Sequence, residues 1–89
     1  MTRIHENIEA EEAILGGILL DPYAIDKVVD ILIPEAFYIS AHQIIYRAAL
    51  TLNQQGLGTD LITLTTWLKN HKQLERVGGK NKLAQLLES

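Results

Sequence analysis

The side chains that could carry chemistry are three histidines and a group of carboxylates near the N-terminus. His5, His42 and His71 lie too far apart in the sequence to form the closely spaced helical pair of a metal site. We therefore predict a surface or capping role for each histidine. The carboxylates could bind a cation, but acidic residues in the first turns of a helix are more commonly solvated and stabilised by the helix dipole. We expect that arrangement for Glu6, Glu9, Glu11 and Glu12.

Two glycine-containing segments could bind phosphate or a dinucleotide, but their spacing argues against both. A phosphate loop ending in Gly79-Lys80 would need a glycine where Leu74 stands and a Ser or Thr where Asn81 stands. The segment Gly56-Leu57-Gly58 lacks the third glycine of a dinucleotide site. The chain also has no cysteine, which excludes disulfides, thiolate zinc sites and cysteine nucleophiles. We predict no catalytic, cofactor-binding or metal-binding residue, and hence no enzyme activity in this chain.

Length and charge favour one small domain that docks onto other proteins. The 89 residues, 47% of them hydrophobic, predict a single domain over 1–89. Residues 1–35 hold eight acidic side chains against two basic ones, whereas residues 36–89 hold six basic against three acidic. Such a split suits self-association or protein docking. No apolar run approaches the roughly 20 residues of a membrane span, and no signal peptide is apparent, so we expect a cytoplasmic protein.

Apolar residues recur at helical spacing along nearly the whole chain. The pattern predicts an all-α fold, one compact bundle of about five or six short helices. The first helix is expected to follow Asn7 as its N-cap. Because a glycine inside a helix costs about 1 kcal/mol relative to alanine, we expect Gly16 and Gly17 to lie against a neighbouring helix. A second helix is predicted to start at Asp21-Pro22 and to end near Pro34.

Capping residues predict where the later helices begin. Ser40 and Gln43 have the spacing of a capping box, and Gly56 ends the helix that follows. The segment from Asp60 is expected to stay extended until Thr63 caps the next helix. A final helix is predicted after Gly78-Gly79.

An ordered set of short segments resembles the N-terminal domain of DnaB-type replicative DNA helicases. The set covers essentially the whole chain from Ile8 onward and is specific only when taken together. Its segments are Ile8–Gly17, Leu20–Pro22, Ile33–Tyr38, Ala41–Tyr46, Asp60–Leu64 with Leu68, and Gln73–Glu75 before Gly78-Gly79.

The resemblance implies a small helical bundle that pairs with a neighbouring copy and forms a collar above the motor ring of a hexamer. Bacterial primase would dock on this collar through its own C-terminal helical domain. ATP, Mg and DNA would bind a separate motor domain, which is absent here together with a helical hairpin. The parent would be an ATP-dependent 5′-to-3′ DNA helicase at the replication fork, in the bacterial cytoplasm and nucleoid, or in a plastid. This fragment would itself lack catalysis.

The candidate partner-binding residues lie in the C-terminal part of the chain. The family often has an aromatic residue four positions after the first glycine of the Gly-Gly turn, where Lys82 stands, so Lys82 and the nearby Lys80 imply a more electrostatic contact with primase. We assign Leu83 and Leu87 to the core, which leaves Leu86 on the flank beside Lys82. Trp67 has two interpretations, a cover over the preceding helical turn or an exposed anchor for a partner.

The alternative function is a free-standing helical module that binds nucleic acid through its basic C-terminal segment. A solvated helix face explains the same charges, no aromatic stacking platform is interleaved with them, and the acidic half would repel phosphate. The cluster consists of Lys69, Lys72, Arg76, Lys80 and Lys82.

Overall fold

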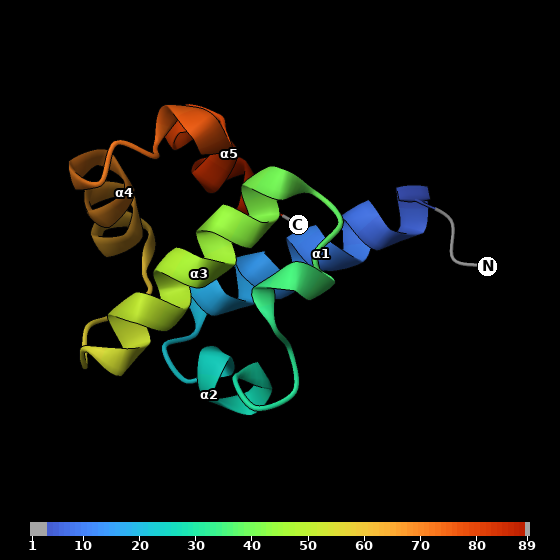
Figure 1. Ribbon diagram of the computed structural model, residues 1–89, viewed down its shortest axis with the longest axis horizontal. Helices are drawn as coiled ribbons and strands as arrows, with labels where there is room; N and C mark the ends of the chain where they lie inside the picture. Colours follow the sequence, from blue (N-terminus) through green and yellow to red (C-terminus); the bar gives the residue numbers. More distant parts are fainter. Residues whose placement is uncertain (1–3, 89) are drawn as a thin grey trace.

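The computed structural model describes the backbone of residues 4–88 and the side chains from Ile8 onward. Within that range the chain is all-helical, as predicted, with five α-helices and two short 3-10 turns and no strand (Figure 1). His5 has no described side chain. The elements in order are α1 (Ile4–Leu20), α2 (Ala24–Val28), η1 (Pro34–Ala36), α3 (Ser40–Gln54), α4 (Leu61–Asn70), η2 (Glu75–Val77) and α5 (Gly79–Leu86).

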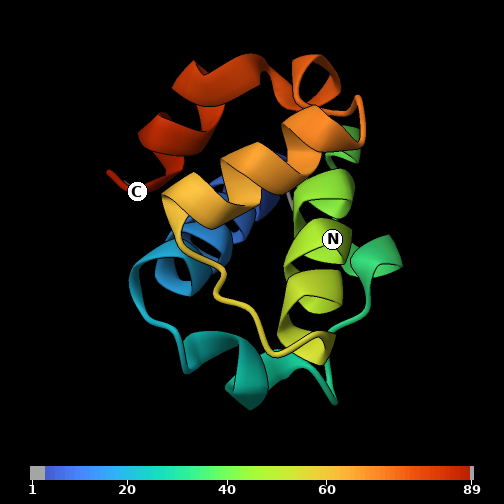
Figure 2. The same ribbon diagram turned by 90° about the vertical axis from the view of Figure 1, so that its left-hand side faces the viewer.

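Helix α3 lies at the centre and organises the core. It packs against α1, α2, α4 and both 3-10 turns, while α5 closes the bundle against α1 and α4 (Figure 2). The buried Tyr46 of α3 keeps its hydroxyl paired by donating to Leu32 O at 2.7 Å, as a buried tyrosine requires. The fully buried aliphatic side chains come from all five helices and include Leu15, Ile25, Ile45, Leu52, Leu64, Leu68, Leu83 and Leu86.

The glycine pair of α1 divides between a buried and an open position. Gly16 is buried, but nothing lies within 4 Å of the place where a Cβ on Gly17 would stand. The expected close approach of another helix at Gly17 is therefore wrong for contacts within this chain. Asn7 does not cap α1 either, because the helix begins three residues earlier, at Ile4.

Helix α2 is shorter than the sequence pattern predicts. Asp21 Oδ1 accepts a hydrogen bond from Tyr23 N at 2.9 Å, and the helix covers only Ala24–Val28 before turns carry the chain onward. Pro34 begins η1 rather than ending α2. The apolar residues after Val28 therefore lie in turns and not in a longer helix α2.

Two predicted caps are wrong although the helices themselves are present. Ser40 is the first residue of α3 and makes no capping bond, and Gln43 Nε2 instead donates to Phe37 O at 2.7 Å. Asp60, not Thr63, caps α4: its carboxylate accepts from Thr63 N at 3.2 Å and from Thr63 Oγ1 at 2.8 Å. Capped by Asp60, helix α4 therefore begins at Leu61, where the sequence reasoning expected an extended segment.

The predicted glycine turns are confirmed. Gly56, just beyond α3, has φ 74°, and Gly78, before α5, has φ 103°, both in the left-handed region that suits glycine. No helix among residues 4–88 is long and apolar enough to cross a membrane.

Candidate functional site

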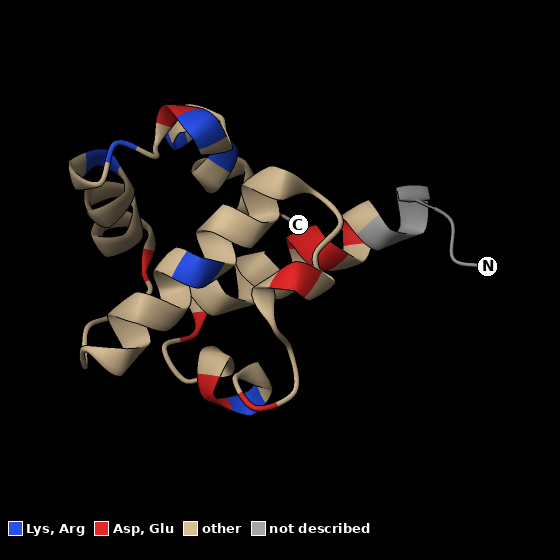
Figure 3. Ribbon diagram, in the orientation of Figure 1, with Lys and Arg blue, Asp and Glu red and all other residues tan. Residues whose placement is uncertain are grey.

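Basic side chains gather at one end of the molecule. Figure 3 shows Lys and Arg around the end of α4, η2 and the start of α5, whereas Asp and Glu lie mainly along α1 and around α2. The charge division predicted from the sequence is therefore also a division in space. It singles out two regions, the acidic face of α1 and the basic end of α4 and α5.

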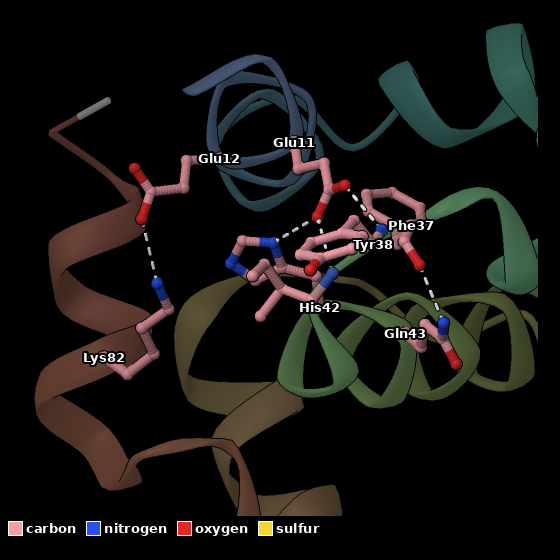
Figure 4. Close-up of polar contacts among 8 residues, drawn as sticks. Glu11, Glu12, Phe37, Tyr38, His42, Gln43 and Lys82 are labelled. Atoms are coloured by element: carbon pink, nitrogen blue, oxygen red, sulfur yellow. Dashed lines mark hydrogen bonds and ion pairs between the residues drawn. The ribbon is translucent and has the colours of Figure 1, made fainter. Parts of the chain in front are cut away.

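The acidic face of α1 holds a buried carboxylate. Glu11 is 7% exposed, and its Oε2 accepts from Tyr38 N at 2.6 Å while its Oε1 accepts from Ile39 N at 3.3 Å (Figure 4). His42 Nδ1 donates to the same Oε1 at 2.7 Å. One side chain of α1 thus accepts hydrogen bonds from the two residues before α3 and from the first turn of α3 itself.

These hydrogen bonds determine the ionisation of Glu11. Burial by itself raises the pKa of the carboxyl, but the bonds from Tyr38 N, His42 and Ile39 N outweigh it and hold the pKa below its ordinary value. The negative charge also lies at the N-terminal end of α3, where the helix dipole favours it. Glu11 is therefore an ionised tertiary cap of α3.

A carboxylate bonded to a histidine could in principle act as a catalytic pair, but this one is sealed inside the fold. The His42 ring is 1% exposed, and its second nitrogen, Nε2, is buried without a hydrogen-bond partner. The edge of the ring faces Phe37, with the two ring centroids 6.4 Å apart. A substrate has no access to either group. The role of the pair is structural, because its hydrogen bond joins α1 to α3.

The Glu11–His42 contact contradicts the surface roles predicted for both residues. A signal was present, since Glu11 is four residues before Leu15 and seven before Ile18, both on the buried face of α1. His42 likewise precedes the buried Ile45 and Tyr46 by three and four residues. Their helical phase thus predicts burial, and two buried polar groups of this kind call for a shared hydrogen bond.

Lys82 is not a free docking residue. Its Nζ lies 2.9 Å from Glu12 Oε2, and the two side chains are 20% and 19% exposed (Figure 4). The ion pair joins α5 to α1 across 70 residues of sequence. The predicted exposed charge is therefore a contact within the chain, and Glu12 is not simply solvated.

Leu86 is also misassigned by the sequence reasoning. It is 0% exposed and belongs to the core together with Leu83, while Leu87 is only partly buried. Helix α5 packs against both α1 and α4, and that position turns Leu86 inward. Leu86 therefore presents no exposed surface in this chain.

Trp67 is partly buried and packs against the core. Its ring stacks on His71, with centroids 3.7 Å apart and planes 15° from parallel. His71 Nδ1 donates to Trp67 O at 2.8 Å, and this exposed histidine fits the predicted surface role. Trp67 therefore covers part of the core and stacks with a surface ring, and its use by a partner stays a prediction.

The remaining candidate, Lys80, lines a groove at the basic end of the molecule. This α4–α5 groove has a volume of about 810 Å³. Three lysines, Lys69, Lys72 and Lys80, line it together with the single acid Glu75. The other lining residues are Leu61, Ile62, Thr65, Thr66, Leu74, Asn81 and Ala84.

Among the described residues, no group of three His, Cys, Asp or Glu side chains could hold a metal ion. Glu11 accepts hydrogen bonds from His42 and from two backbone amides. Two accessible features lie at the predicted partner-binding residues, the α4–α5 groove at Lys80 and the surface around Trp67.

Comparison with known proteins gives a consistent result. The family model described as the DnaB-like helicase N terminal domain matches residues 3–89. A replicative DNA helicase DnaB from a Nostoc species is 63% identical over 93% of this chain, and one from Geobacillus stearothermophilus is 44% identical over 94%. The chain spans only 9% and 18% of the lengths of these two relatives.

A solved structure has the same fold. The crystal structure of the N-terminal domain of DnaB helicase from Mycobacterium tuberculosis superposes with a TM-score of 0.87 and 38% sequence identity. The match covers 91% of this chain and 56% of that one.

Proposed function

Because the chain belongs to the DnaB-like helicase N-terminal domain family, we propose that it is the assembly and docking domain of a hexameric replicative DNA helicase at the replication fork. The observation that carries this proposal is the family match over residues 3–89, nearly the full chain. The agreement of the fold with the mycobacterial N-terminal domain supports it. The domain contributes contacts, not chemistry.

The activity of the parent protein belongs to segments other than this one. We propose that the parent is an ATP- and Mg-dependent 5′-to-3′ DNA helicase that acts in the bacterial cytoplasm, at the nucleoid, or in a plastid. Its ATP site and its DNA contacts lie in a motor domain. The chain spans less than a fifth of the two relatives described above, which leaves ample length for such a domain.

The partners proposed for the domain are a second copy of itself, paired within the hexamer, and the C-terminal domain of primase. Of the four candidate docking residues, Lys82 is paired with Glu12 and Leu86 is buried. Lys80 is exposed and Trp67 is partly buried. We place the primase contact at the basic end, where Lys80 and Trp67 lie on α5 and α4.

The test compares the full-length helicase with the same protein lacking residues 1–89. Light scattering measures the hexamer, and calorimetry measures the affinity for the primase C-terminal domain. Deletion is expected to weaken both hexamer stability and primase binding. The proposal is refuted if the truncated protein forms hexamers and binds primase as the full-length protein does.

The nucleic-acid-binding alternative has less support. One of its five cations, Lys82, is neutralised by Glu12, and no aromatic side chain lines the α4–α5 groove between its lysines. A salt titration of DNA binding distinguishes the two functions. Phosphate contacts give an affinity that falls steeply with salt, and such a slope for this chain would favour the alternative.

A further inference from the structure

The α4–α5 groove combines an apolar lining with a basic rim. The apolar residues come from both walls, Leu61 and Ile62 from α4 and Ala84 from α5, and Ile62 is 76% exposed. Several apolar side chains grouped along one concave surface are a feature of contact regions. Around it stand the side chains of three lysines.

The rim carries net positive charge. Lys69 lies in the last turn of α4, Lys72 in the turn that follows, and Lys80 in the first turn of α5. Glu75 is the only acid among the lining residues. No ion pair within the described residues neutralises these three lysines. An apolar strip bordered by cations matches an amphipathic helix whose apolar face is bordered by carboxylates.

We propose that the α4–α5 groove receives an acidic amphipathic helix of a partner protein. The inference rests on the docking role proposed above and specifies the chemistry of the docked element. Apolar side chains of the helix bury Ile62 and its neighbours, while carboxylates on the flanks of the helix pair with Lys69, Lys72 and Lys80. The pairing of opposite charges steers the encounter and fixes the orientation.

A polar group in the groove has no partner in the chain. Thr65 Oγ1 is buried and makes no hydrogen bond, an arrangement that costs free energy. Because this oxygen has no exposed surface, a carboxylate or amide oxygen of the docked helix can accept a bond from the hydroxyl only after the Thr65 side chain rotates toward the groove. Docking would therefore satisfy a group that the isolated chain leaves unpaired.

Two other occupants fit less well. Single-stranded nucleic acid binds through aromatic stacking as well as cations, and the groove offers an aliphatic lining instead. A second copy of this chain would present exposed acids such as Asp26 and Asp30 from α2 and the turn after it, but α2 has only five residues and is shorter than either wall of the groove. A helix from another protein is the occupant that charge and lining favour together.

The test is a titration of the 89-residue chain with a fluorescein-labelled peptide that repeats leucine and glutamate at helical spacing, followed by fluorescence anisotropy at low and high salt. Lys80→Glu is the informative variant. The helix dipole stabilises a carboxylate in the first turn of α5, so the substitution should leave the fold intact. Lys27→Glu, on α2 at the opposite end of the molecule, is the matched control (Figure 1).

The peptide is expected to bind the unmodified chain. Lys80→Glu should weaken binding by about tenfold and Lys27→Glu by less than about twofold, with the difference shrinking at high salt. Ile62→Ser tests the apolar lining and should weaken binding at every salt concentration. The inference is overturned if the peptide does not bind, or if the two charge reversals have equal effects.

Two further measurements separate the occupants. An oligothymidine that displaces the peptide and binds more tightly would overturn the inference in favour of nucleic acid. Self-association of the chain that Lys80→Glu abolishes would overturn it in favour of a second copy.

The affinity of the primase C-terminal domain for full-length helicase tests the proposed function separately. If primase binds but the peptide does not, this inference fails and the docking function stands. If the peptide binds selectively but primase does not, the groove chemistry stands and the primase contact fails.

Discussion

The substitution Glu11→Gln should destabilise the fold without changing its shape. The Glu11 carboxylate accepts from three donors, Tyr38 N, Ile39 N and His42 Nδ1. A glutamine presents one oxygen and one NH₂ group, so its best orientation serves His42 and Ile39 and turns the NH₂ group toward Tyr38 N. At least one hydrogen bond to a charged acceptor is lost, and such a bond contributes about 1.5–3 kcal/mol.

We therefore expect a loss of about 2–3 kcal/mol in the free energy of unfolding, measured by urea titration of the circular dichroism at 222 nm. For a domain of this size the loss lowers Tm by about 10–20 °C. Asp30→Asn is the matched control, because it removes one negative charge from an exposed side chain. Its effect should stay within about 0.5 kcal/mol.

The pH dependence gives a sharper test of the same reasoning. The pKa of Glu11 in the fold lies below the ordinary value of 4.5, so its ionisation stabilises the fold fully above that value. The contribution is lost as the pH falls through the lower folded-state pKa. The stability difference between the unmodified chain and Glu11→Gln should therefore shrink between pH 5 and about pH 3. A difference that is absent at pH 7, or that is equally large at pH 3, would refute the role assigned to Glu11.

The remaining predictions concern α1 and α5 and use the same unfolding titration. Lys82→Glu should cost about 1 kcal/mol, because it sets two carboxylates together across a partly exposed pair, and adding Glu12→Lys should restore part of the loss; no recovery in the double variant would contradict the pairing. Leu86→Ala should cost about 2–4 kcal/mol by leaving a cavity, whereas a surface leucine would lose almost nothing. Gly17→Ala should stabilise α1 by about 0.5–1 kcal/mol, since open space surrounds the added methyl group; a lower Tm would contradict that geometry.

The sequence predicted those features of the fold that depend on neighbouring residues. The end of α3 at Gly56 and the turn at Gly78 follow from backbone angles that glycine adopts readily. The position of α3 itself was predicted correctly from local spacing. The cap of α4 was misplaced because Asp60 and Thr63 are both good capping residues three positions apart, and only the backbone shows which one accepts.

The parts of the site that depend on tertiary packing could not be predicted in the same way. Glu11 finds its partners 27 to 31 residues away, beyond the reach of any local pattern. In α5, leucines at 83, 86 and 87 permit two choices of buried pair, and the packing of α5 on α1 and α4 decides between them. The α4–α5 groove likewise exists only once α5 has folded back beside α4.

The contact between the first and last helices has a consequence during protein synthesis. The apolar face of α1 leaves the ribosome early, yet it packs against α5, whose buried residues Leu83 and Leu86 are translated some 70 positions after Glu12. The nascent domain therefore cannot complete its core until α5 has emerged from the exit tunnel. A ribosome that stalls before α5 leaves uncovered the part of α1 that packs against α5, and exposed apolar surface of this kind promotes aggregation.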